Sequence, residues 1–152
     1  MLDAVSESKA PAGSQPTRSS AQTRRVAAID IGTNSTHLLV ASVDTTLGTF
    51  SIEQAEKSTT RLGERDPDSG ELTSAGMQRG YETLRRFRDL AISHDVEQIV
   101  TAATSAVREA PNGREFLQSI QDGLGMDVDL VSGPEEARLI YLGVLSGMSF
   151  GD

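Results

Sequence analysis

The chain contains no cysteine among its 152 residues. This absence excludes disulfide bonds, thiolate catalysis and cysteine-ligated zinc, and it fits a cytoplasmic protein. Only two histidines occur, His37 and His94, so a histidine-rich metal site is not expected. No apolar run reaches the roughly 18 residues of a membrane span, and the amino terminus lacks the apolar segment of a secretory signal.

Positive charge is also scarce. The chain has 14 Lys and Arg against 22 Asp and Glu, which gives a formal net charge of −8. We therefore expect no nucleic-acid partner, because non-specific binding to nucleic acid needs a basic surface. An acidic surface repels polyanions as well. Any phosphate site must rely on local donors, or on basic surface supplied by another lobe.

The composition divides the chain in two. Residues 1–24 are rich in Ser, Ala, Thr, Gln and Pro, lack apolar periodicity and are expected to form a disordered tail. Residues 25–152 are expected to form one domain. Aromatic residues make up only 4% of the chain, so the core of this domain must be built mainly from Val, Ile, Leu and Ala.

Hydrophobic patterns predict an α/β domain with the element order βββαβαβα, in which the two helices between the fourth and fifth strands are written as one α. Apolar and β-branched runs predict strands at 26–29, 36–43, 50–60, 99–103 and 128–131. Caps, apolar spacings and Pro134 predict helices at 74–94, 104–109, from Asn112 to Gly123 or Gly125, and 134–146. Thr73 is the expected cap of the first helix, and Asn112 is the expected cap of the helix that ends near Gly123 or Gly125. Three strands in succession followed by β/α units predict a mixed sheet with helices on its faces and a buried strand at 99–103.

The segment from Asp30 to Ser35, Asp-Ile-Gly-Thr-Asn-Ser, separates the first two expected strands. Glycine permits a close approach that a side chain would block, and successive N–H groups in such a turn can bind an anion. The predicted phosphate ligands are Gly32, Thr33, Asn34 and Ser35. Asp30 is the candidate ligand of a divalent cation. An ordinary hairpin turn is the alternative, because the same residue types favour turns.

A second candidate site lies where the fourth expected strand runs into a short helix. This junction offers N–H donors to an anion, and Arg108, about one turn into the helix, can offer two donors to phosphate oxygens. Thr104, Ser105 and Arg108 are therefore predicted to contact phosphate. The alternative is that Thr104 only caps the helix and that Arg108 only pairs with Glu109 or Glu115.

A third motif, Ser-Gly-Pro-Glu-Glu-Ala-Arg at 132–138, begins a helix directly after a strand. Glu135 and Glu136 fall in its first turn, where acidic residues complement the helix dipole. The residues that follow are apolar nearly all round the helix, which predicts a buried helix and a rigidly held carboxylate. One of the two acids can therefore act as a general base toward water.

Four motifs occur in a fixed order along the chain. They are A-A-I-D-I-G-T-N-S-x-H-L-L-V from Ala27, R-L-G at 61–63, T-A-A-T-S-A-V-R-E-A-x-N from Thr101, and S-G-x-E-E-A-R-L-I-Y-L-G-V from Ser132. Together they cover about residues 25–145, and they resemble the exopolyphosphatase and guanosine pentaphosphate phosphohydrolase (Ppx/GppA) family.

The resemblance implies an actin-like ATPase (ribonuclease H-like) lobe and a hydrolase that uses Mg²⁺. It implies that polyphosphate or guanosine pentaphosphate is the substrate, that the enzyme is cytoplasmic and linked to the stringent response, and that it forms a homodimer. By position, it puts the catalytic base on Glu136, the first phosphate loop on residues 30–35 and a phosphate-contacting arginine on Arg108.

One family feature falls beyond this sequence. The family carries a second phosphate loop, of the D-x-G-G-G-S type, shortly after the glutamate-bearing helix, whereas this sequence runs to Asp152 without one. We therefore expect the N-terminal lobe of a two-lobe enzyme. Two alternatives remain, a module that binds phosphate without catalysis and an ATP-using kinase of the same superfamily. Arg108 and the Glu-Glu-Ala-Arg motif favour the hydrolase.

Overall fold

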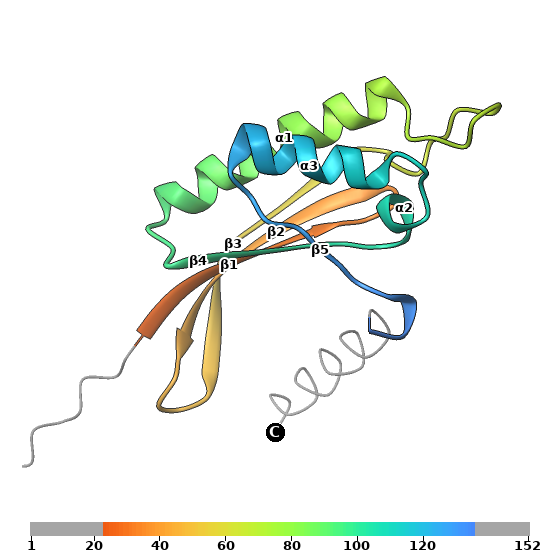
Figure 1. Ribbon diagram of the computed structural model, residues 1–152. Coiled ribbons are helices and arrows are strands. Elements are labelled where there is room, and N and C mark those ends of the chain that lie inside the picture. Colours follow the sequence, from red (N-terminus) through yellow and green to blue (C-terminus); the bar gives the residue numbers. More distant parts are fainter. Residues whose placement is uncertain (1–22, 136–152) are drawn as a thin grey trace, which may run out of the picture.

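The computed structural model describes residues 23–135 as a five-stranded mixed sheet with two long helices on one face (Figure 1). The strands are β1 (Thr23–Ile31), β2 (Ser35–Asp44), β3 (Thr49–Thr59), β4 (Gln98–Ala103) and β5 (Asp129–Leu130). The helices are α1 (Ser74–Ser93), α2 (Ser105–Arg108) and α3 (Gly113–Leu124). Within residues 23–135, no helix is both long and apolar enough to cross a membrane.

The strands lie in the order β3-β2-β1-β4-β5. The first three form the predicted antiparallel meander, while β4 runs parallel to β1, and β5 runs parallel to β4. The carboxyl ends of β1, β4 and β5 therefore meet at one edge of the sheet. Ligands of open α/β sheets bind at this kind of edge, and the three candidate site segments, which include Asp30, Thr104 and Ser132, lie there.

The core lies between the sheet and the helices α1 and α3. Alternate residues of β1 point into it, as the two-residue period of a strand requires, and the buried apolar residues of α1 belong to the same core cluster. The largest fully buried side chains are Phe87, Ile29, Ile31, Leu38, Leu62, Leu84 and Ile120. Small and branched residues thus fill most of the core, in agreement with the low aromatic content.

The opposite face of the sheet differs from the prediction. No helix among residues 23–135 covers it, and it forms a hollow of about 770 Å³. Val100 points to this side and is 46% exposed, so the prediction of a wholly buried strand at 99–103 is wrong. The expected last helix starts as predicted, because the backbone is helical from Gly133 to Glu135, but its remainder falls outside the described residues.

Two predicted helix caps have different outcomes. The hydroxyl of Thr73 accepts the N–H of Gly76 at 3.0 Å and so caps α1 as predicted. Asn112 precedes α3, but its side chain makes no capping hydrogen bond. Instead, its buried amide accepts the N–H of Leu72 at 2.8 Å and donates to the carbonyl of Leu72 at 3.1 Å. Asn112 therefore ties the segment that precedes α1 to the start of α3.

Candidate phosphate site

The turn from Gly32 to Ser35 joins β1 and β2 and is closed by its own backbone. The N–H of Gly32 donates to the carbonyl of Ser35 at 3.0 Å. A Cβ atom on Gly32 would lie 2.7 Å from that carbonyl oxygen, so only glycine fits without a shift of the backbone. Within residues 23–135, no acceptor takes the backbone N–H of Thr33 or Asn34. The turn therefore has the donors that an anion needs.

A second loop, residues 60–63, is bonded directly to this turn. The N–H groups of Thr60 and Arg61 donate to the carbonyl of Asn34 at 3.1 and 3.0 Å, and the N–H of Gly63 donates to the carbonyl of Thr33 at 2.7 Å. A Cβ atom on Gly63 would lie 2.4 Å from the Thr33 methyl carbon. These hydrogen bonds from the second loop to the turn were not predicted from the sequence. The signal was present, since the antiparallel pairing of β2 with β3 returns the chain to the turn at this point.

The first and second motifs meet through their side chains. Thr33 Oγ1 and Ser105 Oγ lie 3.1 Å apart, within hydrogen-bond distance, although 72 residues separate them in the sequence. Thr104 is buried, and both its N–H and its hydroxyl donate to the carbonyl of Ile31, at 3.2 and 3.4 Å. Ser105 thus faces the turn, while Thr104 holds the end of β4 against the end of β1.

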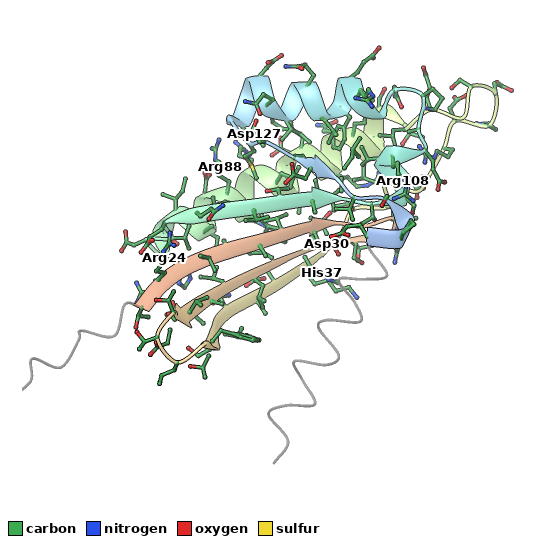
Figure 2. All side chains as sticks on the ribbon, turned by 60° about the horizontal axis from the view of Figure 1, so that its bottom comes forward. Arg24, Asp30, His37, Arg88, Arg108 and Asp127 are labelled. Carbon is green, nitrogen blue, oxygen red and sulfur yellow. The ribbon has the colours of Figure 1, made fainter. Side chains whose placement is uncertain are left out.

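Arg108 lies at the same edge of the sheet but is engaged with protein groups. Its Nη1 donates to the carbonyl of Val131, and its Nη2 lies 3.6 Å from a carboxylate oxygen of Glu109. The pairing with Glu109 is the alternative that the sequence left open, and the bond to Val131 is new. Figure 2 shows Arg108, Asp30 and His37 toward one end of the sheet and Arg24 at the other. A role for Arg108 in phosphate binding stays a prediction.

Asp30 is exposed on the face of the sheet that no helix of residues 23–135 covers, next to His37 of β2. The described part of the chain contains no group of three or more His, Asp or Glu side chains placed to hold a metal ion. Mg²⁺ commonly keeps several waters and takes one or two carboxylates together with substrate oxygens. Asp30 at the end of β1 fits that binding mode, so it remains the candidate ligand.

The third motif also reaches this edge. The N–H of Glu135 donates to the hydroxyl of Ser132 at 3.2 Å, so a helical turn begins directly after β5. Glu136, the predicted catalytic base, lies outside the described residues. Its place after the carboxyl end of β5 follows from the sequence alone.

Two carboxylates with lowered pKa values stabilise parts of the fold other than this turn. The N–H groups of Ser69 and Asp68 and the hydroxyl of Ser69 lower the pKa of Asp66, which closes the turn before α1. A hydrogen bond from Ser42, followed by the charge of Arg25, lowers the pKa of Glu53 near the amino end of β1. Both carboxylates lie outside the candidate phosphate site, so that site is identified by its hydrogen-bond donors.

Sequence comparison relates the chain to known phosphatases. The profile of the Ppx/GppA phosphatase family matches residues 39–152. Exopolyphosphatase 1 of Mycobacterium tuberculosis and that of Mycobacterium bovis are each 34% identical over 121 residues, which cover 79% of this chain and 35% of each relative. The chain therefore spans about a third of the length of these curated relatives.

Comparison with solved structures relates the chain to the same family of phosphatases. A Ppx/GppA family member from Aquifex aeolicus matches with a TM-score of 0.74 and 31% identity, over 80% of this chain and 39% of its own. An exopolyphosphatase from Cytophaga hutchinsonii matches with a TM-score of 0.74 and 33% identity, over 80% and 38%. The expected actin-like α/β fold is thereby confirmed, and the chain belongs to the Ppx/GppA phosphatase family.

Proposed function

We propose that this chain is the phosphate-binding lobe of an exopolyphosphatase that releases the terminal phosphate of inorganic polyphosphate. The contact between Thr33 and Ser105 is the observation that carries the proposal, because it unites two separate motifs beside the open N–H groups of the turn. Curated relatives that are named exopolyphosphatases support this choice of substrate. Guanosine pentaphosphate, which the resemblance also implied, is not named by these relatives.

Hydrolysis of polyphosphate depends on positioning of the phosphate and neutralisation of its charge, and it needs no covalent intermediate. The N–H groups of Thr33 and Asn34, with the hydroxyls of Ser35 and Ser105, would hold the oxygens of the terminal phosphate. The guanidinium of Arg108, which lies at the Val131 carbonyl just after β5, would donate to the phosphate from that side. Mg²⁺ held at Asp30 would offset negative charge on the phosphate chain.

The water that attacks phosphorus needs a base. We assign this role to Glu136, whose carboxylate would orient an in-line water and take its proton. The new P–O bond forms as the bond to the next phosphate breaks, which leaves inorganic phosphate and a chain one unit shorter. The cytoplasmic location and the homodimer implied by the family belong to this proposal as well.

A phosphate-binding module without turnover is the second candidate. The observation in its favour is that the chain spans 35% of the length of the curated relatives. Binding by this chain is common to both candidates. A binding assay therefore tests the site whether or not the chain turns over substrate.

Ser105→Ala tests the junction of the two motifs. We expect the Kd of the 152-residue chain for tripolyphosphate to rise about tenfold, because a hydrogen bond to a charged group contributes roughly 1.5–3 kcal/mol. Isothermal titration calorimetry measures this change. Ser93→Ala is the control, since that hydroxyl donates to a carbonyl within α1, away from the site.

The outcomes separate two failures. If the wild-type chain binds tripolyphosphate and Ser105→Ala binds equally well, the site is misplaced. If the wild-type chain does not bind tripolyphosphate with or without Mg²⁺, the proposal of a phosphate-binding lobe is wrong.

A further inference from the structure

Arg61 has a backbone conformation that is unusual for an arginine. Its φ is +53°, and only Asp95 shares a positive φ among the non-glycine residues at 23–135. The left-handed region is unfavourable for residues with a long side chain, whereas Asp tolerates it. Such strain persists only where the surroundings impose it, and it clusters at functional sites.

The surroundings of Arg61 explain how the strain is held. Its N–H donates to the carbonyl of Asn34 within the phosphate turn, at 3.0 Å. Leu62, the next residue, is 1% exposed in the core, and Gly63 is fixed against Thr33. Packing therefore explains two residues of the R-L-G motif. It does not explain the side chain of Arg61, which is 64% exposed.

The charge of Arg61 is only weakly compensated. Its Nη1 lies 3.9 Å from one carboxylate oxygen of Glu64, whereas Arg79 donates to the other oxygen at 2.8 Å. Arg79 also donates to the carbonyl of Thr60, so it is fixed beside this carboxylate. Glu64 is thus engaged mainly by Arg79, and exposed pairs at long distance contribute little.

An arginine is therefore hydrogen-bonded through its backbone to the phosphate turn, in a chain whose net charge is −8. The turn supplies N–H donors from Thr33 and Asn34, and Ser105 of α2 lies against it. The side chain of Arg61 extends into solvent. A guanidinium group can bind a phosphate through two parallel hydrogen bonds. A polyphosphate held in the turn by its terminal group carries further phosphates that must lie outside the turn.

We propose that Arg61 binds a phosphate of the polymer next to the terminal one, and so forms a subsite for the substrate chain. This inference rests on the proposed function, since it needs polyphosphate at the turn. It predicts that Arg61 matters for a chain of several phosphates and not for a single phosphate ion.

Arg61→Gly tests this subsite without loss of the fold. Glycine adopts a positive φ without steric cost, so the midpoint of thermal unfolding should stay close to that of the wild-type chain. The Kd for tripolyphosphate should rise about tenfold. The Kd for orthophosphate should change by less than about twofold, because one phosphate in the turn leaves Arg61 without a ligand.

Three further variants complete the experiment. Asparagine also tolerates a positive φ, so Arg61→Asn replaces the glycine variant if that variant unfolds. The tripolyphosphate Kd of Arg61→Lys should lie between those of Arg61→Gly and the wild type, because lysine keeps the charge but lacks the planar guanidinium. Arg85→Gln removes one positive charge on the exposed side of α1, where Arg85 pairs with Glu82. This control should leave both affinities unchanged.

Several results would overturn the inference. Equal tripolyphosphate binding by Arg61→Gly and wild type would reject Arg61 as a ligand and leave the proposed function standing. Equal weakening for orthophosphate and tripolyphosphate would show that Arg61 acts on the turn, and a matching loss in Arg85→Gln would show a general charge effect. No binding of either ligand by the wild-type chain would reject the proposed function itself.

Discussion

Gly32→Ala should weaken the binding of tripolyphosphate to this chain about 100-fold, because it displaces the N–H donors of the turn, each worth roughly 1.5–3 kcal/mol toward a charged group. The added Cβ atom would lie 2.7 Å from the carbonyl oxygen of Ser35, which accepts the N–H that closes the turn. Overpacking of this kind costs about 1–3 kcal/mol of stability as well. Calorimetric titration and urea denaturation measure the two effects separately.

The control for Gly32→Ala is Gly48→Ala in the hairpin between β2 and β3. Gly48 has a φ of +66°, so alanine strains the backbone there, but its Cβ atom would meet no atom within 4 Å. We expect Gly48→Ala to lose some stability and to bind tripolyphosphate as the wild type does. If Gly32→Ala also bound normally, the turn would not be the anion site.

Glu136→Gln should lower the rate of phosphate release about 1000-fold in a protein that carries this lobe and hydrolyses polyphosphate. A positioned general base contributes roughly 10²–10⁴-fold, and the amide of glutamine accepts no proton. The Kd for polyphosphate should change little, because the proposed base contacts water rather than phosphate. Phosphate release over time gives the rate, and titration calorimetry gives the Kd.

Glu135→Gln is the matched control, since it removes the carboxylate of the preceding residue in the sequence. We expect it to change the rate by less than about tenfold, as helix-dipole and capping effects at that position amount to roughly 0.3–1 kcal/mol. A wild-type rate in Glu136→Gln would show that another group activates the water. A larger loss of rate in Glu135→Gln than in Glu136→Gln would show that Glu135 is the general base.

The parts of the fold that depend on neighbouring residues were predictable. The meander, the helix beginning after Thr73 and the turn at Gly32 all follow from local periodicity and from turn or cap residues. The family motifs then identified the fold class, which the structure confirms. Hydrophobic periodicity and turn preferences depend on a few neighbouring residues, so they can be recognised in a single sequence.

The contacts that assemble the site were not predictable in the same way. Asn112 resembles a helix cap, yet its side chain pairs with Leu72, 40 residues away. Gly63 resembles a loop glycine, yet it is required by its close approach to Thr33. Arg108 donates to the Val131 carbonyl, 23 residues further on. Each of these contacts joins residues that lie far apart in the sequence, and a single residue does not encode which distant segment it will meet.

A titration of this chain with tripolyphosphate, followed through the backbone amide resonances in ¹⁵N-resolved NMR spectra, tests the phosphate site most directly. Amides that donate to an anion shift on binding. We expect the largest changes at Thr33, Asn34 and Ser105, with smaller ones near Arg61. Changes confined to the exposed arginines of α1, such as Arg85 and Arg86, or no changes at the turn, would contradict a phosphate site between β1 and β4.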